Sequence, residues 1–74
     1  MAFRNLEFSG NTVTGRIVNT ETGQPLPGAN VVIPETNEGA ATWVDGSFTI
    51  HADAPIERIT ASFVGFQTIQ AQRQ

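Results

Sequence analysis

Apolar and polar side chains alternate at every second residue along much of this chain, which is the period of a β-strand and not of a helix. The clearest case is the segment 58–63, where Ile59, Ala61 and Phe63 fall on one face. Residues 12–18 are rich in β-branched side chains and alternate in a similar way. No window has the 3.6-residue period of an amphipathic helix, so the sequence predicts an all-β fold.

Turn-forming residues divide the sequence into short β-prone segments. Pro25 and Pro27 cannot donate to a sheet, and they predict a loop over residues 19–28. Asp45-Gly46 predicts a tight two-residue hairpin turn, because glycine accepts a positive φ without a Cβ clash. Strands are expected at 12–18, 29–33, 39–44, 47–51, 58–63 and 66–71. This spacing is typical of a small antiparallel Greek-key β-sandwich with six to seven strands.

The N-terminal segment 1–11 supplies the seventh strand of this count. Leu6 and Phe8 alternate with Asn5 and Glu7, which is the pattern of a half-buried strand. We expect residues around 4–9 to cover an open sheet edge, either in the same chain or in a strand-exchanged homodimer. The same-chain arrangement is favoured, because one short link is sufficient.

The chain has 74 residues and no cysteine, so a single domain over residues 1–74 must be held by packing and backbone pairing alone. A domain of this size buries only roughly 60% of the surface of its unfolded chain. The alternation, together with Leu26 as the one buried anchor of the loop 19–28, predicts the core, which is made of Val13 or Ile17 together with Leu26, Val31, Ile33, Phe48, Ile50, Ile59, Ala61, Phe63 and Ile69.

The charge pattern argues against several classes of partner. Seven acidic residues and four arginines give a formal net charge of −3, and the arginines are dispersed. Nucleic acids and anionic membranes are bound by clustered cations, so neither is expected as a partner. No apolar run approaches the roughly 20 residues that span a bilayer. The first residues are too polar for the apolar core of a signal peptide.

Ser47, His51 and Asp53 are the residue types of a catalytic triad. The sequence around Ser47 has no nucleophile-elbow motif, and no glycine-rich segment accompanies it to form an oxyanion hole. One histidine without cysteine cannot build a zinc centre. We therefore expect no catalytic residue, no metal site and no cofactor.

Two pairs of carboxylates have the spacing of candidate acid–base pairs. Glu35 and Glu38 form one, and Asp53 and Glu57 form the other. Both pairs fall in predicted loops without a neighbouring apolar wall that would raise a pKa. Solvated loop residues are the favoured interpretation.

Trp43 is the candidate contact residue, and its interpretation depends on the turn that follows it. With a two-residue turn at Asp45-Gly46, Trp43 lies opposite Phe48 and both face the core. With a longer turn, Trp43 is exposed and available to a partner or a sugar ring. The preference of Asp-Gly for two-residue turns favours the core.

Five separate blocks of the sequence resemble the carboxypeptidase-D regulatory-like domains, which are transthyretin-like sandwiches. The resemblance covers about residues 12–71, and Trp43 stands where this family usually has aspartate. The blocks are Val13-Thr14-Gly15-Arg16-Ile17-Val18, Thr22-Gly23-Gln24-Pro25-Leu26-Pro27-Gly28-Ala29-Asn30-Val31, Gly39-Ala40-Ala41-Thr42, Asp45-Gly46-Ser47-Phe48 and Ser62-Phe63-Val64-Gly65-Phe66.

Such domains occur in TonB-dependent outer-membrane receptors and beside secreted peptidases. The resemblance implies a non-catalytic accessory domain that contacts neighbouring domains or another protein. It also implies a periplasmic, outer-membrane or secreted location. The alternative is a carbohydrate-binding module that uses an exposed Trp43, since β-sandwiches commonly carry sugar sites.

Overall fold

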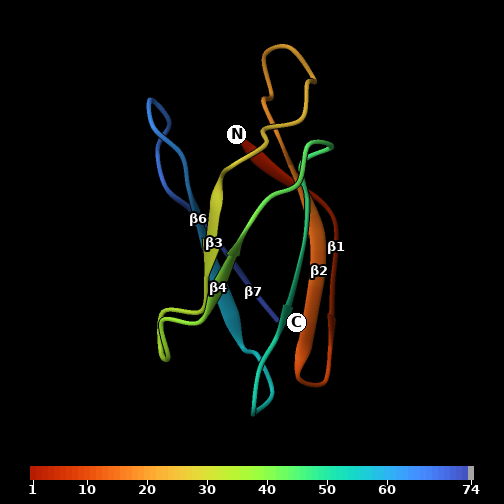
Figure 1. Ribbon diagram of the computed structural model, residues 1–74, viewed down its shortest axis with the longest axis vertical. Helices are drawn as coiled ribbons and strands as arrows, with labels where there is room; N and C mark the ends of the chain where they lie inside the picture. Colours follow the sequence, from red (N-terminus) through yellow and green to blue (C-terminus); the bar gives the residue numbers. More distant parts are fainter. Residues whose placement is uncertain (74) are drawn as a thin grey trace.

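Seven antiparallel strands form two facing sheets in the computed structural model, which describes residues 1–73 (Figure 1). The all-β sandwich expected from the sequence is thereby confirmed. One sheet has the order β1-β2-β5 and the other has the order β4-β3-β6-β7. Within residues 1–73, no helix is long and apolar enough to cross a membrane. The strands are β1 (Ala2–Ser9), β2 (Thr12–Val18), β3 (Asn30–Val32), β4 (Gly39–Ala41), β5 (Ser47–His51), β6 (Arg58–Ser62) and β7 (Ile69–Gln72).

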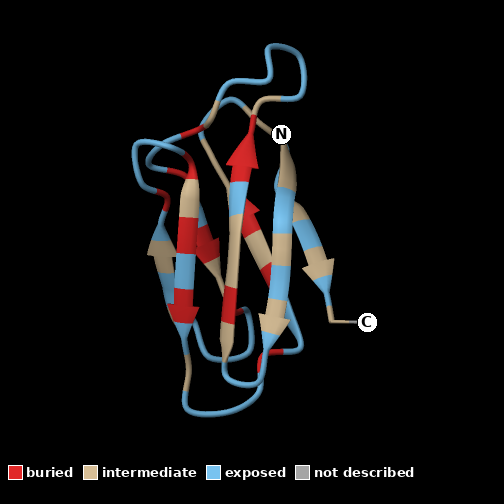
Figure 2. Cartoon of the chain, turned by 90° about the vertical axis from the view of Figure 1, so that its right-hand side faces the viewer, coloured by how far each residue is buried: buried red, intermediate tan, exposed pale blue. Residues whose placement is uncertain are grey.

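Buried and exposed residues alternate along the strands, so the core lies between the two sheets (Figure 2). Most of the predicted core is buried, and Val13 and Ile17 are both fully enclosed. The prediction was wrong for Phe63 and Ile69, which are only half-buried. Phe63 follows the last residue of β6, and Ile69 belongs to the edge strand β7. The buried apolar residues are Val13, Ile17, Val18, Leu26, Ala29, Val31, Ile33, Phe48, Ile50, Ile56, Ile59 and Ala61.

Gly15 makes room for the largest side chain of the core. It lies directly opposite Phe48 in the β2–β5 pair. A Cβ atom at Gly15 would lie 3.0 Å from the Phe48 ring and 3.1 Å from the Leu6 side chain. The Phe3 ring meets the Phe48 ring edge-on, with 6.1 Å between their centroids. Because Gly15 has no side chain, the Phe48 ring fits between β2 and the apolar side chains of β1.

The N-terminal segment forms the edge strand β1, which pairs antiparallel with β2 of the same chain. The register shifts between Arg4 and Glu7, and Asn5 has a φ of 53°. This irregularity is a β-bulge, which places one extra residue on β1. It lets Phe3 and Leu6, three residues apart, both pack against the core, although regular alternation would turn them to opposite faces.

Four strands are shorter than the sequence pattern predicts, and the difference is small for β3 and β6 but reaches three residues at one end of β4 and of β7. β4 ends at Ala41 and not at Val44, because the chain turns away in the hairpin that follows. β7 begins at Ile69 and not at Phe66. A turn occupies the intervening residues, since the Phe66 amide donates to the Phe63 carbonyl at 3.0 Å.

Candidate interaction surface

The hairpin between Trp43 and Ser47 has a three-residue loop and not the predicted two-residue turn. The Trp43 amide donates to the Ser47 carbonyl at 2.9 Å, and the Gly46 amide donates to the Trp43 carbonyl at 2.8 Å. Val44, Asp45 and Gly46 form the loop, and Gly46 has a φ of 79°. A turn followed by a residue in the left-handed conformation is the usual geometry of a three-residue hairpin.

This turn determines which way Trp43 points. Trp43 is hydrogen-bonded opposite Ser47, and residues opposite each other on paired strands share a face. Phe48 points into the core, so its neighbour Ser47, and with it Trp43, face outward. The Trp43 side chain is 70% exposed. The favoured prediction that Trp43 belongs to the core was therefore wrong, because the extra loop residue changes its strand partner.

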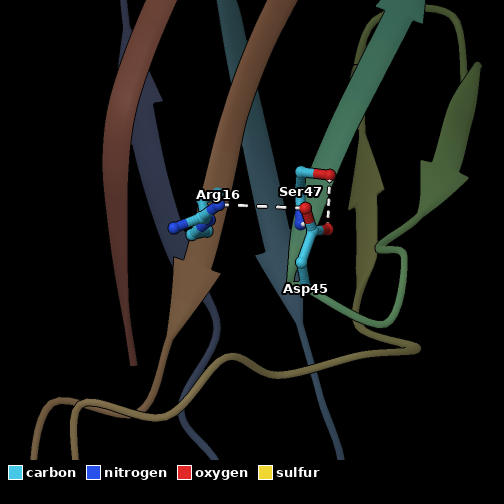
Figure 3. Close-up of polar contacts among 3 residues, drawn as sticks. All are labelled: Arg16, Asp45 and Ser47. Atoms are coloured by element: carbon cyan, nitrogen blue, oxygen red, sulfur yellow. Dashed lines mark hydrogen bonds and ion pairs between the residues drawn. The ribbon is translucent and has the colours of Figure 1, made fainter.

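Asp45 stabilises the hairpin loop from within (Figure 3). One of its carboxylate oxygens accepts hydrogen bonds from the Ser47 hydroxyl at 2.6 Å and from the Ser47 amide at 3.0 Å. The Arg16 guanidinium lies 3.8 Å from the other oxygen. These hydrogen bonds and, to a smaller extent, Arg16 lower the pKa of Asp45 below its ordinary value of 3.8.

Thr42 attaches the base of the hairpin to the segment 26–29, which comes before β3. Its side chain is buried, and its hydroxyl accepts a hydrogen bond from the Ala29 amide at 2.9 Å and donates to the Leu26 carbonyl. The Thr42 amide donates to the Ala29 carbonyl at 2.9 Å, and the Gly28 amide donates to the Thr42 carbonyl at 3.0 Å. The exposed Trp43 therefore follows directly after a fixed residue.

A second loop exposes another apolar side chain at the same end of the sandwich. Val64 is 87% exposed, in the turn closed by the Phe63 and Phe66 backbones. Val44 is also 87% exposed. Figure 1 shows the loops 43–46 and 63–68 at the end that also carries the loop 19–28. Among residues 1–73, the exposed large apolar side chains are these three, and we call the end of the sandwich that carries Trp43, Val44 and Val64 the apolar end (Figure 1).

Val44 and Val64 were not identified from the sequence as surface residues. Each is an apolar residue within or next to a turn signal, Val44 before Asp45-Gly46 and Val64 before Gly65. An apolar side chain in a turn has no sheet face to share with the core. A position beside the turn signal is the feature that favours exposure of both, although a loop residue such as Ile56 can still be buried by tertiary contacts.

The residue types of a catalytic triad are separated along the sandwich. Ser47 and His51 lie at opposite ends of β5, and Ser47 is engaged by Asp45. His51 Nδ1 lies 3.1 Å from the Thr12 hydroxyl. Asp53 follows in an exposed loop. Across the described residues, no group of three or more His, Asp or Glu side chains could hold a metal ion.

The two predicted carboxylate pairs lie together at the opposite end of the sandwich. Glu35, Glu38, Asp53 and Glu57 line one groove between the loops 33–38 and 52–57. Glu35 is bonded to the Arg58 guanidinium, and this hydrogen bond lowers the pKa of Glu35 below its ordinary value of 4.5. The sequence placed these residues in loops, as observed, but the expectation that no apolar wall lies beside them was wrong, because the two loops form one groove whose lining includes Ala52, Ala54 and Pro55.

Comparison with known proteins gives one family and one relative. Residues 13–74 match the family described as the CarboxypepD_reg-like domain. Over 56 residues, which are 76% of the chain, the sequence is 45% identical to the TonB-dependent receptor SusC of Bacteroides thetaiotaomicron. The chain corresponds to only 5% of the length of that receptor. The comparison with solved structures gave no match.

Proposed function

This chain belongs to the CarboxypepD_reg-like domain family, and from that premise we propose that it is a non-catalytic interaction domain of a larger bacterial protein. The relative at 45% identity is a TonB-dependent receptor, and the shared region is a small part of it. The proposed context is therefore an outer-membrane or secreted protein of this kind, with the domain in the periplasm or at the outer membrane. Its proposed partner is a neighbouring domain of the same protein.

The observation that carries the proposal is the apolar end. Trp43 and Val44 are adjacent in the chain and both are exposed, and contiguous apolar surface is typical of contact sites. Tryptophan is enriched among the residues that contribute most to protein–protein binding. The Asp45 hydrogen bonds and the Thr42 anchor hold the hairpin loop in place before contact. A preorganised loop loses little conformational entropy on binding.

The test is a calorimetric titration of this domain against the remainder of the protein in which it occurs. The double variant Trp43→Ala/Val64→Ala is expected to weaken binding by at least tenfold, because an anchoring tryptophan typically contributes about 2 kcal/mol or more. The matched control is Thr49→Ala, which changes an exposed side chain on β5 away from the apolar end.

Both variants should melt within a few degrees of the unmodified domain, since these side chains lie outside the core. Unchanged binding by the double variant would reject the apolar end as the contact. Absence of any binding or stabilisation by the rest of the protein would reject the proposed role.

A second candidate function, carbohydrate binding, is favoured by the exposure of Trp43. A sugar ring can stack on an exposed indole, so binding would shift the Trp43 fluorescence. Trp43 is the sole tryptophan of the chain, which makes the signal specific. Titration with soluble polysaccharides should change this emission, and Trp43→Phe should retain part of the affinity. If no polysaccharide in the titration changes the Trp43 emission, carbohydrate binding is rejected and the protein-contact role remains.

A further inference from the structure

The loops 33–38 and 52–57 lie at the end of the sandwich opposite the apolar end (Figure 1), and a groove lies between them. Its volume is about 520 Å³, within the range of roughly 300–1,000 Å³ that is usual for ligand pockets. Ala52, Ala54 and Pro55 contribute apolar surface to the lining, and the buried side chains of Ile33 and Ile56 lie beneath it. Carboxylates from both loops also line it.

Both walls of the groove are fixed by hydrogen bonds to their backbone. In the first loop, the Ile33 amide donates to the Glu38 carbonyl at 2.7 Å, and the Ile33 carbonyl accepts from the Asn37 amide at 2.8 Å. In the second loop, the Ala52 amide donates to the Asn11 carbonyl at 2.8 Å. Arg73 Nε donates to the Ile56 carbonyl at 2.9 Å. The groove therefore exists before a ligand arrives, which lowers the entropic cost of binding.

The lining of the groove is negatively charged. It contains four of the seven carboxylates of the chain, Glu35, Glu38, Asp53 and Glu57, and none of its arginines. Arg58 pairs with Glu35 from outside the lining. Among residues 1–73, the other three carboxylates form no ion pair. An apolar surface bordered by unpaired carboxylates is complementary to a ligand that combines apolar groups with cations.

We propose that this groove binds an extended polypeptide segment in which arginine or lysine alternates with aliphatic residues. Aliphatic side chains of such a segment can contact Ala52, Ala54 and Pro55, while the long flexible side chains of the neighbouring cations reach the carboxylates at the rim. A divalent cation fits less well, because no three acidic groups of the described chain converge on one point. The lining also contains no aromatic ring on which a sugar could stack.

The test uses a short capped peptide of alternating arginine and leucine, titrated into the isotopically labelled domain in the presence of EDTA. Amide chemical shifts are expected to change within residues 33–38 and 52–57. The same peptide with glutamate in place of arginine, or with serine in place of leucine, should bind at least tenfold more weakly. Raising the salt concentration should weaken binding, since exposed ion pairs are screened.

A matched pair of variants separates the groove from general electrostatics. Glu38→Gln/Glu57→Gln removes two carboxylates of the groove, and Glu7→Gln/Glu21→Gln removes two from other exposed positions. The first should weaken binding about tenfold and the second less than twofold. Equal effects of the two variants, or equal binding of the glutamate or serine peptide, would overturn the proposal. Trp43→Ala/Val64→Ala should leave peptide binding unchanged. The test of the groove is therefore independent of the test of the apolar end.

Discussion

The Ile17 amide donates a hydrogen bond to the Gly46 carbonyl at 2.8 Å, and this contact joins the hairpin loop to the strand β2. Neighbouring backbone and side-chain atoms lie very close to Gly46. A Cβ atom at Gly46 would lie 2.6 Å from the Ile17 carbonyl oxygen and 2.9 Å from the Pro25 side chain. Gly46 is itself buried and has a positive φ, so both its backbone conformation and its surroundings exclude a side chain.

Gly46→Ala is therefore expected to lower the free energy of unfolding by about 2–5 kcal/mol. The left-handed conformation costs a residue with a Cβ about 1–2 kcal/mol, and displacement of packed backbone adds a further cost of about 1–3 kcal/mol. Urea denaturation measures the change. Gly10→Ala is the control, because Gly10 also has a positive φ but has open space around it, and about 1–2 kcal/mol is expected there. Equal losses at both positions would show that close packing at Gly46 contributes nothing.

Much of the sandwich could be predicted from the sequence because the period of two persists in the central strands. The alternation of Phe48 with Ile50 and of Ile59 with Ala61 identified buried positions correctly. Buried residues in loops are harder to predict, since no periodicity marks them. Ile56 follows Pro55 in a loop and is nevertheless almost fully buried.

The candidate surfaces were less predictable than the core. The position of Trp43 depended on whether the hairpin loop has two or three residues, and the dipeptide Asp45-Gly46 is compatible with both. The loop length is selected by contacts distant in the sequence, in which Gly46 packs against Ile17 and Thr42 bonds to Leu26 and Ala29. The groove at the opposite end likewise depends on tertiary structure, because its two walls are separated by β4 and β5.

Phe48 and Phe63 test how the core is distributed. Phe48→Ala should cost about 3–5 kcal/mol, because the ring is 1% exposed and leaves a cavity between the sheets. Phe63→Ala should cost clearly less, since Phe63 is half-buried and packs beside Phe66 at 5.8 Å between ring centroids. Denaturation of the two variants under the same conditions provides the comparison. A larger loss for Phe63 would place the centre of the core nearer β7 than the burial pattern does.

Asp45 should make stability depend on acid pH. Its pKa in the folded protein is lowered, so the unfolded chain binds the proton more readily. The resulting stabilisation is fully present above the ordinary value of 3.8 and is lost as the pH falls through the lower pKa of the folded state. Glu35 acts in the same direction through its bond to Arg58.

Asp45→Asn should remove the contribution of Asp45, so the thermal midpoint of the variant should fall less steeply in acid than that of the unmodified domain. Asparagine keeps an oxygen that can accept from Ser47, which limits the structural change. Thermal melts followed by circular dichroism from neutral pH into the acid range measure both profiles. Two parallel profiles would mean that the hydrogen bonds of Asp45 do not favour its ionised form.

Deletion of residues 1–9 should both destabilise the domain and promote association. The deletion removes Phe3 from the Phe48 ring and Leu6 from its position over Gly15, and it leaves the edge of β2 without a partner. Loss of these apolar contacts should lower the free energy of unfolding by at least about 3 kcal/mol. An unpaired strand edge exposes N–H and C=O groups that pair readily with another chain, so light scattering should detect dimers or larger species. The control is Asn5→Gly, which preserves the bulge of β1 because glycine accepts its positive φ. If the truncated chain stays monomeric and has the same thermal midpoint as the unmodified domain, β1 is dispensable for the fold.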